Sequence, residues 1–301
     1  GLQRVLRSGK LQVIANTGDD FEHLGLTICP DIDTLIYTLA GIVNPNNGWG
    51  RENESWNFMD SLKKLGGEIW FRLGDRDLAT HIRRTELLQT GASLSEVTAE
   101  LSKSFGVAVR VWPMSDEPVR TLVETDQGPM AFQDYFVRYK TEPVATSFQY
   151  EGCELASASA GAIEALGDAS SGAIIFTPSN PWLSIDPIMA LSDIKTAIKV
   201  STAPVIGISP IVGGRAVKGP TVKLMRELGI EPSVLSIAAH YREFLDGLII
   251  DSQDDWHQDA IEAMGIKVKV CNTMMMNLSD KIQLAEDTLQ FAADLRTGNI
   301  A

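Results

Sequence analysis

Two aspartates within one turn of a predicted helix are the clearest candidates for chemistry in this sequence. Asp31 and Asp33 follow Pro30 at the start of a helical pattern that runs to about residue 41. Carboxylates here, beside a loop that carries Asp19 and Asp20, offer the hard oxygen ligands that Mg²⁺ shares with a substrate phosphate. Aspartates also cap free N–H groups and suit the helix dipole, so capping explains the same pattern. Both interpretations hold together if one aspartate caps and the other binds the ion.

Polar loops follow several short apolar segments that are predicted to be strands. The segments are residues 11–15, 172–176, 204–208 and 247–250, and the loops after them are residues 16–20, 177–181, 209–214 and 251–255. Two further strand candidates are residues 234–237 and 266–271. Helical patterns alternate with these segments, which predicts an α/β fold with a doubly wound, mainly parallel sheet covered on both faces. In such sheets ligands bind beyond the carboxyl ends of the strands, where these polar loops lie.

Two of these loops are candidates for holding an anion. The loop at residues 177–181 offers hydroxyls and backbone N–H groups directly after a strand, although its Ser-Asn-Pro sequence is also an ordinary turn. The loop at residues 209–214 is followed by Arg215 and Lys218. Its small residues let backbone approach a phosphate while two cations neutralise it, although a lone surface cation is more often simply solvated. Neither a Walker loop nor a G-x-G-x-x-G loop is present there.

The middle of the chain, residues 51–167, has a different character. It carries a hairpin signal around residues 126–128 and helical stretches at residues 56–65 and 93–105. Residues 74–77 hold Asp75, Arg76 and Asp77, with more charged residues after them. The aspartates can cap the following helix, or this segment can reach a polar group of a substrate.

Composition excludes several classes of function. The net charge of −13 lacks the basic field that draws proteins to nucleic acid. The three cysteines lie far apart with no C-x-x-C pair, which fits a reducing compartment and no structural zinc. The four histidines show no H-x-x-x-H spacing, and there is no G-x-S-x-G nucleophile motif. No apolar run is long enough to cross a bilayer, so we expect a cytoplasmic protein with no membrane partner.

A series of motifs runs in order along nearly the whole chain. They are residues 16–20, 28–34, 73–77, 79–82, 113–118, 132–134, 178–181, 209–211 and 218–220. In combination they resemble the 2-phospho-L-lactate transferase family of deazaflavin coenzyme F-420 biosynthesis. The resemblance implies a Rossmann-like transferase that moves a phosphorylated three-carbon acid from a guanosine diphosphate donor to the ribityl hydroxyl of the deazaflavin Fo, releasing GMP. Members of this family begin with a strand and a Gly-rich phosphate loop, which we expect to precede Gly1.

The resemblance also implies roles for individual residues. Asp33, with Asp31 assisting, would hold Mg²⁺ on the donor diphosphate, or Asp33 would accept the proton of the Fo hydroxyl. The nucleotide and its phosphates would be held by Asn16, Thr17, Ser179, Asn180, Ser209 and Lys218. The Fo side would be shaped by Asp75, Arg76 and Trp49, because a planar ring favours apolar and aromatic walls. The donor acid can be phospholactate, phosphoenolpyruvate or phosphoglycerate, and the family suggests a homodimer.

The predicted organisation places a nucleotide-binding core at residues 1–50 and 168–301. Residues 51–167 would form an inserted α+β subdomain that contributes to the acceptor side. One alternative stays open, because a related branch of this fold would bind nucleotide sugars as a regulator without catalysis. A nicotinamide-dependent dehydrogenase is poorly supported, since no dinucleotide loop is visible.

Overall fold

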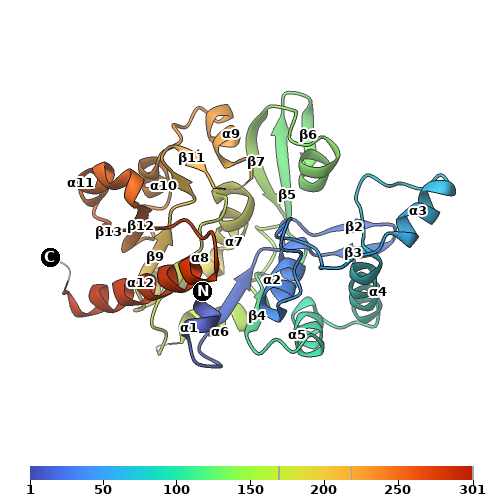
Figure 1. The fold of residues 1–301 in the computed structure, drawn as a ribbon, viewed down its shortest axis with the longest axis horizontal. Helices are drawn as coiled ribbons and strands as arrows, with labels where there is room; N and C mark the ends of the chain where they lie inside the picture. Colours follow the sequence, from blue (N-terminus) through green and yellow to red (C-terminus); the bar gives the residue numbers. More distant parts are fainter. Residues whose placement is uncertain (169, 218, 300–301) are drawn as a thin grey trace. The chain divides into compact units, whose positions relative to one another are not determined.

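Two compact units make up the computed structural model, which describes residues 1–168, 170–217 and 219–299. The first unit comprises residues 1–7 and 163–301, and the second comprises residues 8–162. The unit boundaries therefore lie near residues 7 and 163, whereas the sequence suggested boundaries near residues 50 and 168. Figure 1 shows the elements of both units along the chain.

A four-stranded parallel sheet forms the centre of the first unit, as the apolar segments predicted. Its strand order is β13-β12-β9-β8, with bounds β8 Ile174–Phe176, β9 Val205–Ile208, β12 Gly247–Asp251 and β13 Lys267–Cys271. Every residue of β9 and β12 is buried, in keeping with their apolar sequences, which only Asp251 at the end of β12 interrupts. The long helix α12 (Leu278–Thr297) packs Leu284 and Phe291 against Ile206 and Ile249 of the sheet (Figure 1).

Shorter elements surround this sheet. They are α1 (Leu2–Val5), η2 (Pro181–Ile185), α7 (Asp186–Ala190), α8 (Ser192–Val200), β10 (Ile211–Val212), β11 (Arg215–Ala216), α9 (Thr221–Glu227), α10 (Val234–His240), η3 (Ser252–His257) and α11 (Gln258–Glu262). The helix α6 (Ala160–Gly167) crosses the boundary between the units. The prediction of a strand at residues 234–237 is wrong. Ser233 caps a helix there by accepting a hydrogen bond from the backbone N–H of Ser236, so this short apolar run is the buried face of α10.

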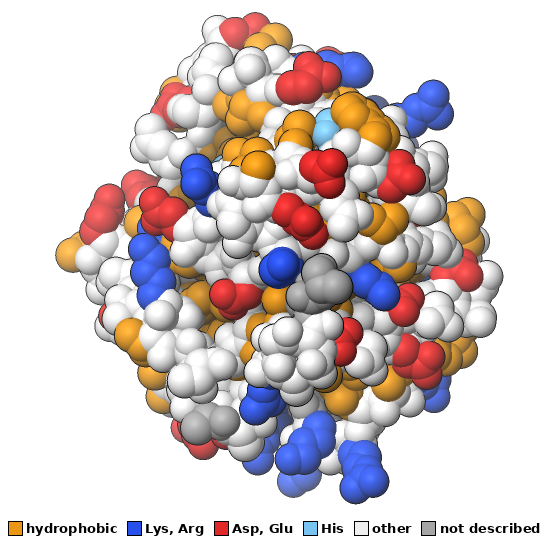
Figure 2. All heavy atoms as spheres, turned by 90° about the vertical axis from the view of Figure 1, so that its left-hand side faces the viewer, with side chains coloured by type: hydrophobic (Ala, Val, Ile, Leu, Met, Phe, Trp, Pro, Cys, Tyr) orange, Lys and Arg blue, Asp and Glu red, His pale blue; other side chains and the backbone are white. Residues whose placement is uncertain are grey.

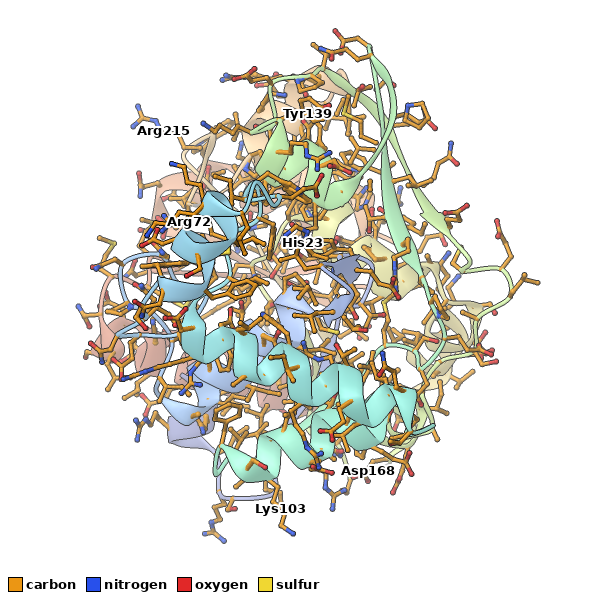
Figure 3. The ribbon with its side chains drawn as sticks, turned by 90° about the vertical axis from the view of Figure 1, so that its right-hand side faces the viewer. His23, Arg72, Lys103, Tyr139, Asp168 and Arg215 are labelled. Atoms are coloured by element: carbon orange, nitrogen blue, oxygen red, sulfur yellow. The ribbon has the colours of Figure 1, made fainter. Side chains whose placement is uncertain are left out.

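The second unit is built on a parallel pair of strands with helices around it. The strand β1 (Gln12–Ala15) pairs with β4 (Arg110–Pro113), a strand that the sequence did not indicate. The helices α2 (Pro30–Ala40) and α5 (Leu94–Ser104) pack on this pair and share its core. The helix α4 (Asp75–Gln89) lies beside α5 (Figure 3).

The remaining strands of this unit form two antiparallel groups. The strand β2 (Phe21–His23) makes a hairpin with β3 (Leu26–Ile28). The predicted hairpin around residues 126–128 is present, because β5 (Arg120–Thr125) pairs with β6 (Gly128–Ala131) and also with β7 (Ala145–Glu151). Two further helices are α3 (Asn57–Lys64) and η1 (Asp134–Arg138).

Two properties of the described residues bear on possible partners. None of their helices combines the length and the apolar character that a membrane span requires. On the face shown in Figure 2, acidic and basic side chains are interspersed over much of the surface.

Candidate functional site

A loop of buried polar residues follows β1 in the second unit. Residues 16–20 are all buried, including Asp19 and Asp20. The Asn16 side chain shapes this loop, because its Oδ1 accepts a hydrogen bond from Gly18 N at 2.7 Å. Its Nδ2 donates to Oδ2 of Asp31 at 2.9 Å. The structure thus joins Asn16 and Asp31, two predicted site residues, through one hydrogen bond.

The two aspartates of α2 lie in its first turn, as predicted, but they do not serve as side-chain caps. The helix begins at Pro30 with Cys29 at the N-cap, and that position makes no side-chain capping hydrogen bond. Among the described residues, the side chain of Asp31 bonds Asn16 and that of Asp33 bonds Arg84. Both carboxylates can still gain from the positive end of the helix dipole. Their side chains are therefore committed to tertiary contacts.

Burial dominates the electrostatics of this acidic group. Burial raises the pKa of Asp19 well above its usual range, and the neighbouring Asp31 raises it further. Burial also raises the pKa of Asp20 to about 7, against the opposing effects of Cys29, Arg120 and Arg84. The pKa of Asp31 is raised by burial as well.

Several polar atoms of the same loop lack a hydrogen-bond partner within the described part of the chain. They are Oγ1 of Thr17 and one carboxylate oxygen each of Asp19 and Asp20. Buried carboxylates without enough partners are costly to ionise, and a bound cation would remove that cost.

A second buried network surrounds Asp33. Arg84 of α4, whose side chain is only 1% exposed, donates from Nη2 to Oδ1 of Asp33. Its Nη1 donates to Nδ1 of His81 at 3.2 Å and to the carbonyl of Thr27 at 3.3 Å. Because Nδ1 accepts this bond, the ring proton of a neutral His81 belongs on Nε2, which faces Oδ2 of Asp77 at 3.5 Å.

Hydrogen bonds also hold Asp77, the residue of this network that lies beyond His81. The Tyr37 hydroxyl donates to Oδ1 of Asp77 at 2.6 Å and lies 2.8 Å from Oγ1 of Thr80. One ligand atom from each of Asp33, Asp77 and His81 lies within 4.8 Å of the others, a spacing that could hold a metal ion. Arg84 already supplies a positive charge at this point, which disfavours a second cation there.

Sequence reasoning missed most of this network. Asp77, Thr80, His81 and Arg84 follow the i, i+3, i+4, i+7 spacing of one helical face, and this pattern was available. A polar stripe at that spacing normally indicates a solvated helix face. Here the stripe faces inward, because α4 packs this side against β3 and Tyr37 of α2. The partner 51 residues away could not be found from spacing alone.

The predicted acceptor-side residues have other contacts. Asp75 organises the start of α3: its carboxylate accepts from Ser55 Oγ at 2.7 Å and from the backbone N–H groups of Asn57 and Phe58 at 3.0 Å each. These bonds, with that from Ser55 the largest, lower the pKa of Asp75 to about 2. The prediction that Asp75 caps the following helix is therefore wrong, because its carboxylate binds the start of the preceding helix α3 and the N-cap of α4 makes no side-chain hydrogen bond. Arg76 and Trp49 have exposed side chains, and Trp49 is 59% exposed.

An aromatic cluster that the sequence did not single out lies near the β2–β3 hairpin. We define it as Phe21, His23, Trp70 and Phe71, whose ring centroids lie 4.8 to 6.1 Å apart. Nε2 of His23 is buried without a partner among the described residues, and burial lowers the pKa of this ring. The guanidinium of Arg138 lies 4.4 Å from the Trp70 ring, and Figure 3 labels His23.

The remaining predicted residues lie in the first unit, at the carboxyl edge of its sheet. Phe176 and Ile208 end neighbouring parallel strands, so the loops with Ser179, Asn180 and Ser209 leave the same edge. Oγ of Ser179 lies 3.1 Å from Oγ1 of Thr177.

Two of these side chains are engaged locally. Asn180 Oδ1 caps η2 by accepting from Leu183 N at 3.2 Å, and its Nδ2 donates to Thr221 at 3.1 Å. Within the described part of the chain, Ser209 Oγ bonds the backbone of Ile211 alone. Lys218 lies outside the described residues.

Asp251, another residue that was not predicted, lies at the end of β12. Its Oδ2 accepts from Thr273 N at 2.8 Å and its Oδ1 from Gln253 N at 3.1 Å. Burial acts to raise the pKa of Asp251, but these hydrogen bonds lower it overall. Asp251 therefore ties two loops together at the sheet edge.

Comparison with known proteins agrees with the resemblance seen in the motifs. The family model described as 2-phospho-L-lactate transferase CofD matches residues 1–288. A phosphoenolpyruvate transferase of Streptomyces griseus is 39% identical over 98% of this chain and 94% of its own, and a 2-phospho-L-lactate transferase of Methanosarcina mazei is 37% identical over 96% and 94%. A crystal structure of protein BH3568 from Bacillus halodurans has the same fold, with a TM-score of 0.58, 13% identity and 96% of each chain covered. The chain therefore belongs to the 2-phospho-L-lactate transferase CofD family.

Proposed function

We propose that this protein transfers a phosphorylated three-carbon acid from a guanosine diphosphate donor to the ribityl hydroxyl of Fo and releases GMP. The names of the relatives, at 37% to 39% identity over nearly the whole chain, support a transferase of this type in coenzyme F-420 biosynthesis. The observation that carries the mechanism is the buried acidic loop after β1, in which one carboxylate oxygen each of Asp19 and Asp20 has no hydrogen-bond partner among the described residues. Such a group is suited to charge neutralisation, which this kind of transfer needs more than covalent help.

The acidic loop fits Mg²⁺ by its donor chemistry. Asp19, Asp20 and Asp31 supply carboxylate oxygens, the ligands that this ion prefers, and burial raises the pKa of all three carboxyls. We propose Asp31 as the central ligand, because Asn16 fixes its orientation. Asp33 is the other candidate ligand from the sequence. When bound, Mg²⁺ would neutralise charge on the donor diphosphate.

Asp33 is also suited to receive a proton. Arg84 occupies its Oδ1, whereas the buried Oδ2 makes no hydrogen bond among the described residues and lies 3.6 Å from Nδ1 of His81. A carboxylate whose second oxygen stays free can accept the proton of an attacking hydroxyl within hydrogen-bond reach. The incoming alkoxide oxygen would then attack the phosphorus of the three-carbon acid's phosphate, and GMP would leave with the bonding electrons.

Binding of the two substrates is assigned by chemical class. The polar loops after β8 and β9, with Ser179, Asn180 and Ser209, are our candidates for the donor nucleotide, together with Lys218. The aromatic cluster is our candidate wall for the planar Fo ring, and it takes over the part that the sequence gave to Trp49. Asp75 and Arg76 stay predictions for the acceptor side.

Product analysis with each candidate donor would identify the three-carbon acid that this protein transfers. The relatives carry two different names at nearly equal identity, so they do not select between phosphoenolpyruvate and phospholactate. The protein is incubated with Mg²⁺, Fo and each of the three guanylylated donors, and products are identified by mass spectrometry. We expect one donor to yield GMP and an Fo adduct whose mass increases by that of the transferred group. Binding of a uridine diphosphate sugar without binding of Fo would contradict the proposal and favour a regulator.

A further inference from the structure

Arg84 is among the largest fully buried side chains of the described residues, and it is charged. Arginine is almost never fully buried unless it is paired. Here the guanidinium contacts Asp33, His81 and the carbonyl of Thr27, so acceptors surround it on more than one side. The planar guanidinium group is therefore fixed in orientation by three separate elements, α2, α4 and β3.

Stability alone does not explain this buried pair. Replacing a buried ion pair by apolar residues of similar volume is often neutral or stabilising, because the desolvation of both charges offsets their attraction. Asp33, one member of the pair, also lies in the same helical turn as Asp31. A contact with little expected net gain in stability, placed two residues from a candidate metal ligand, points to a role in the site.

The geometry assigns Arg84 a positioning role, an inference that rests on the proposed function: it holds Oδ1 of Asp33 so that Oδ2 is the oxygen left for the proton of the substrate hydroxyl. The bond from Nη2 fixes the rotation of the carboxylate about its last side-chain torsion. His81 holds Nη1 of the same guanidinium, and Asp77 faces the other side of the His81 ring. Arg84 touches no substrate in this account and acts only through Asp33.

Lysine cannot replace arginine in this position. Its ammonium is a single point donor, so it cannot bond Asp33, His81 and Thr27 with one planar group. A misplacement of a reacting group by about 1 Å can cost about 10²-fold in rate. We therefore expect Arg84→Lys to lower kcat about 10²-fold while the KM values for donor and Fo change by less than about threefold.

The matched control is the neighbouring arginine. Arg83 lies on the exposed side of α4 and pairs with Glu86 at 2.8 Å and Glu100 at 2.6 Å. Arg83→Lys makes the same chemical change one residue away, and we expect wild-type kcat for it. Binding stoichiometry for Fo, measured by the fluorescence of that ligand, counts the folded sites in each preparation.

Chemical rescue gives a second test that does not depend on Arg84→Lys. Added guanidinium at millimolar concentration should raise kcat of Arg84→Ala at least tenfold over its value without the additive. Equimolar urea, which is neutral and similar in shape, should leave this kcat unchanged. Unchanged kcat in Arg84→Lys, or a loss of rate in proportion to lost Fo stoichiometry, would overturn the positioning role. If Arg84→Ala does not fold, the kcat values of Arg84→Lys and Arg83→Lys alone test the positioning role. Wild-type protein that transfers nothing from any donor would overturn the proposed function and this inference together.

Discussion

The raised pKa of Asp20 predicts a pH dependence of stability that one substitution should remove. Burial moves this pKa from 3.8 to about 7 in the folded protein. The unfolded chain ionises near pH 4, so between about pH 4 and pH 7 the folded state binds the proton more tightly. Stability should therefore fall as the pH rises through this window and stay level above it. Asp20→Asn replaces the carboxyl by a neutral group of the same shape and should abolish this contribution.

The magnitude follows from the size of the shift. About three pH units at about 1.4 kcal/mol each correspond to an upper limit of about 4 kcal/mol. At about 2–4 °C per kcal/mol for chains of comparable size, Asp20→Asn should melt up to about 16 °C higher than wild type at pH 8. The two proteins should melt within about 2 °C of each other near pH 4, where Asp20 is protonated in the folded state and about half protonated in the unfolded chain.

Calorimetry from pH 4 to pH 8.5, in the presence of a chelator, measures this difference. Asp60→Asn on the exposed side of α3 is the matched control, and its melting temperature should follow wild type at every pH. Added Mg²⁺ at pH 8 should raise the melting temperature of wild type more than that of Asp20→Asn, because a ligand stabilises the state that binds it. A difference between wild type and Asp20→Asn that is the same at pH 4 and pH 8 would refute the reasoning.

Three further predictions concern the site. Asp31→Asn should lower the rate of transfer about 10²–10⁴-fold, as for loss of a positioned catalytic group, and should raise the Mg²⁺ concentration needed for activity. Steady-state assays across Mg²⁺ concentrations measure both effects, and an unchanged Mg²⁺ requirement would count against Asp31 as a ligand. Trp70→Leu should weaken Fo binding at least tenfold in fluorescence titrations while donor binding is retained, and equal weakening of both would exclude a specific Fo wall. Asp75→Ala should speed hydrogen exchange at the Asn57 amide by removing its acceptor, and unchanged exchange there would disprove this capping.

The fold of the first unit could be predicted because its strands are buried on both sides. The segments at residues 204–208 and 247–250 are continuously apolar, and such runs bounded by turn residues indicate parallel strands. The same rule failed at residues 234–237, since a short apolar run fits a strand or a buried helical turn equally well. Capping by Ser233 decides for the helix, and that signal is only one residue long. The strand β4 was missed because Pro113 and Arg110 weaken its strand pattern.

The candidate site was predictable in part for a related reason. Local spacing indicated the acidic residues, because Asp31 and Asp33 share a turn and Asp19 lies in a loop directly after a strand. The partners of these residues come from tertiary structure, so spacing could not assign them. Arg84 lies 51 residues from Asp33, and its burial depends on how α4 packs in the unit. The acidic residues could therefore be predicted from the sequence, whereas the cation that pairs with Asp33 could not.

The charged groups around Asp31 and Asp33 distinguish these two aspartates, which the sequence pattern alone could not. Asp31 is held by a neutral amide and lies near the carboxylate of Asp19, and it forms no ion pair with any of the described residues. Asp33 has an internal cation in Arg84. A carboxylate without a cation gains most from a bound metal ion, whereas one that is already paired gains little and keeps its free oxygen for a proton. Two acidic residues in one helical turn can thus take different parts in a single transfer, and the difference is set by a helix that lies more than forty residues further along the chain.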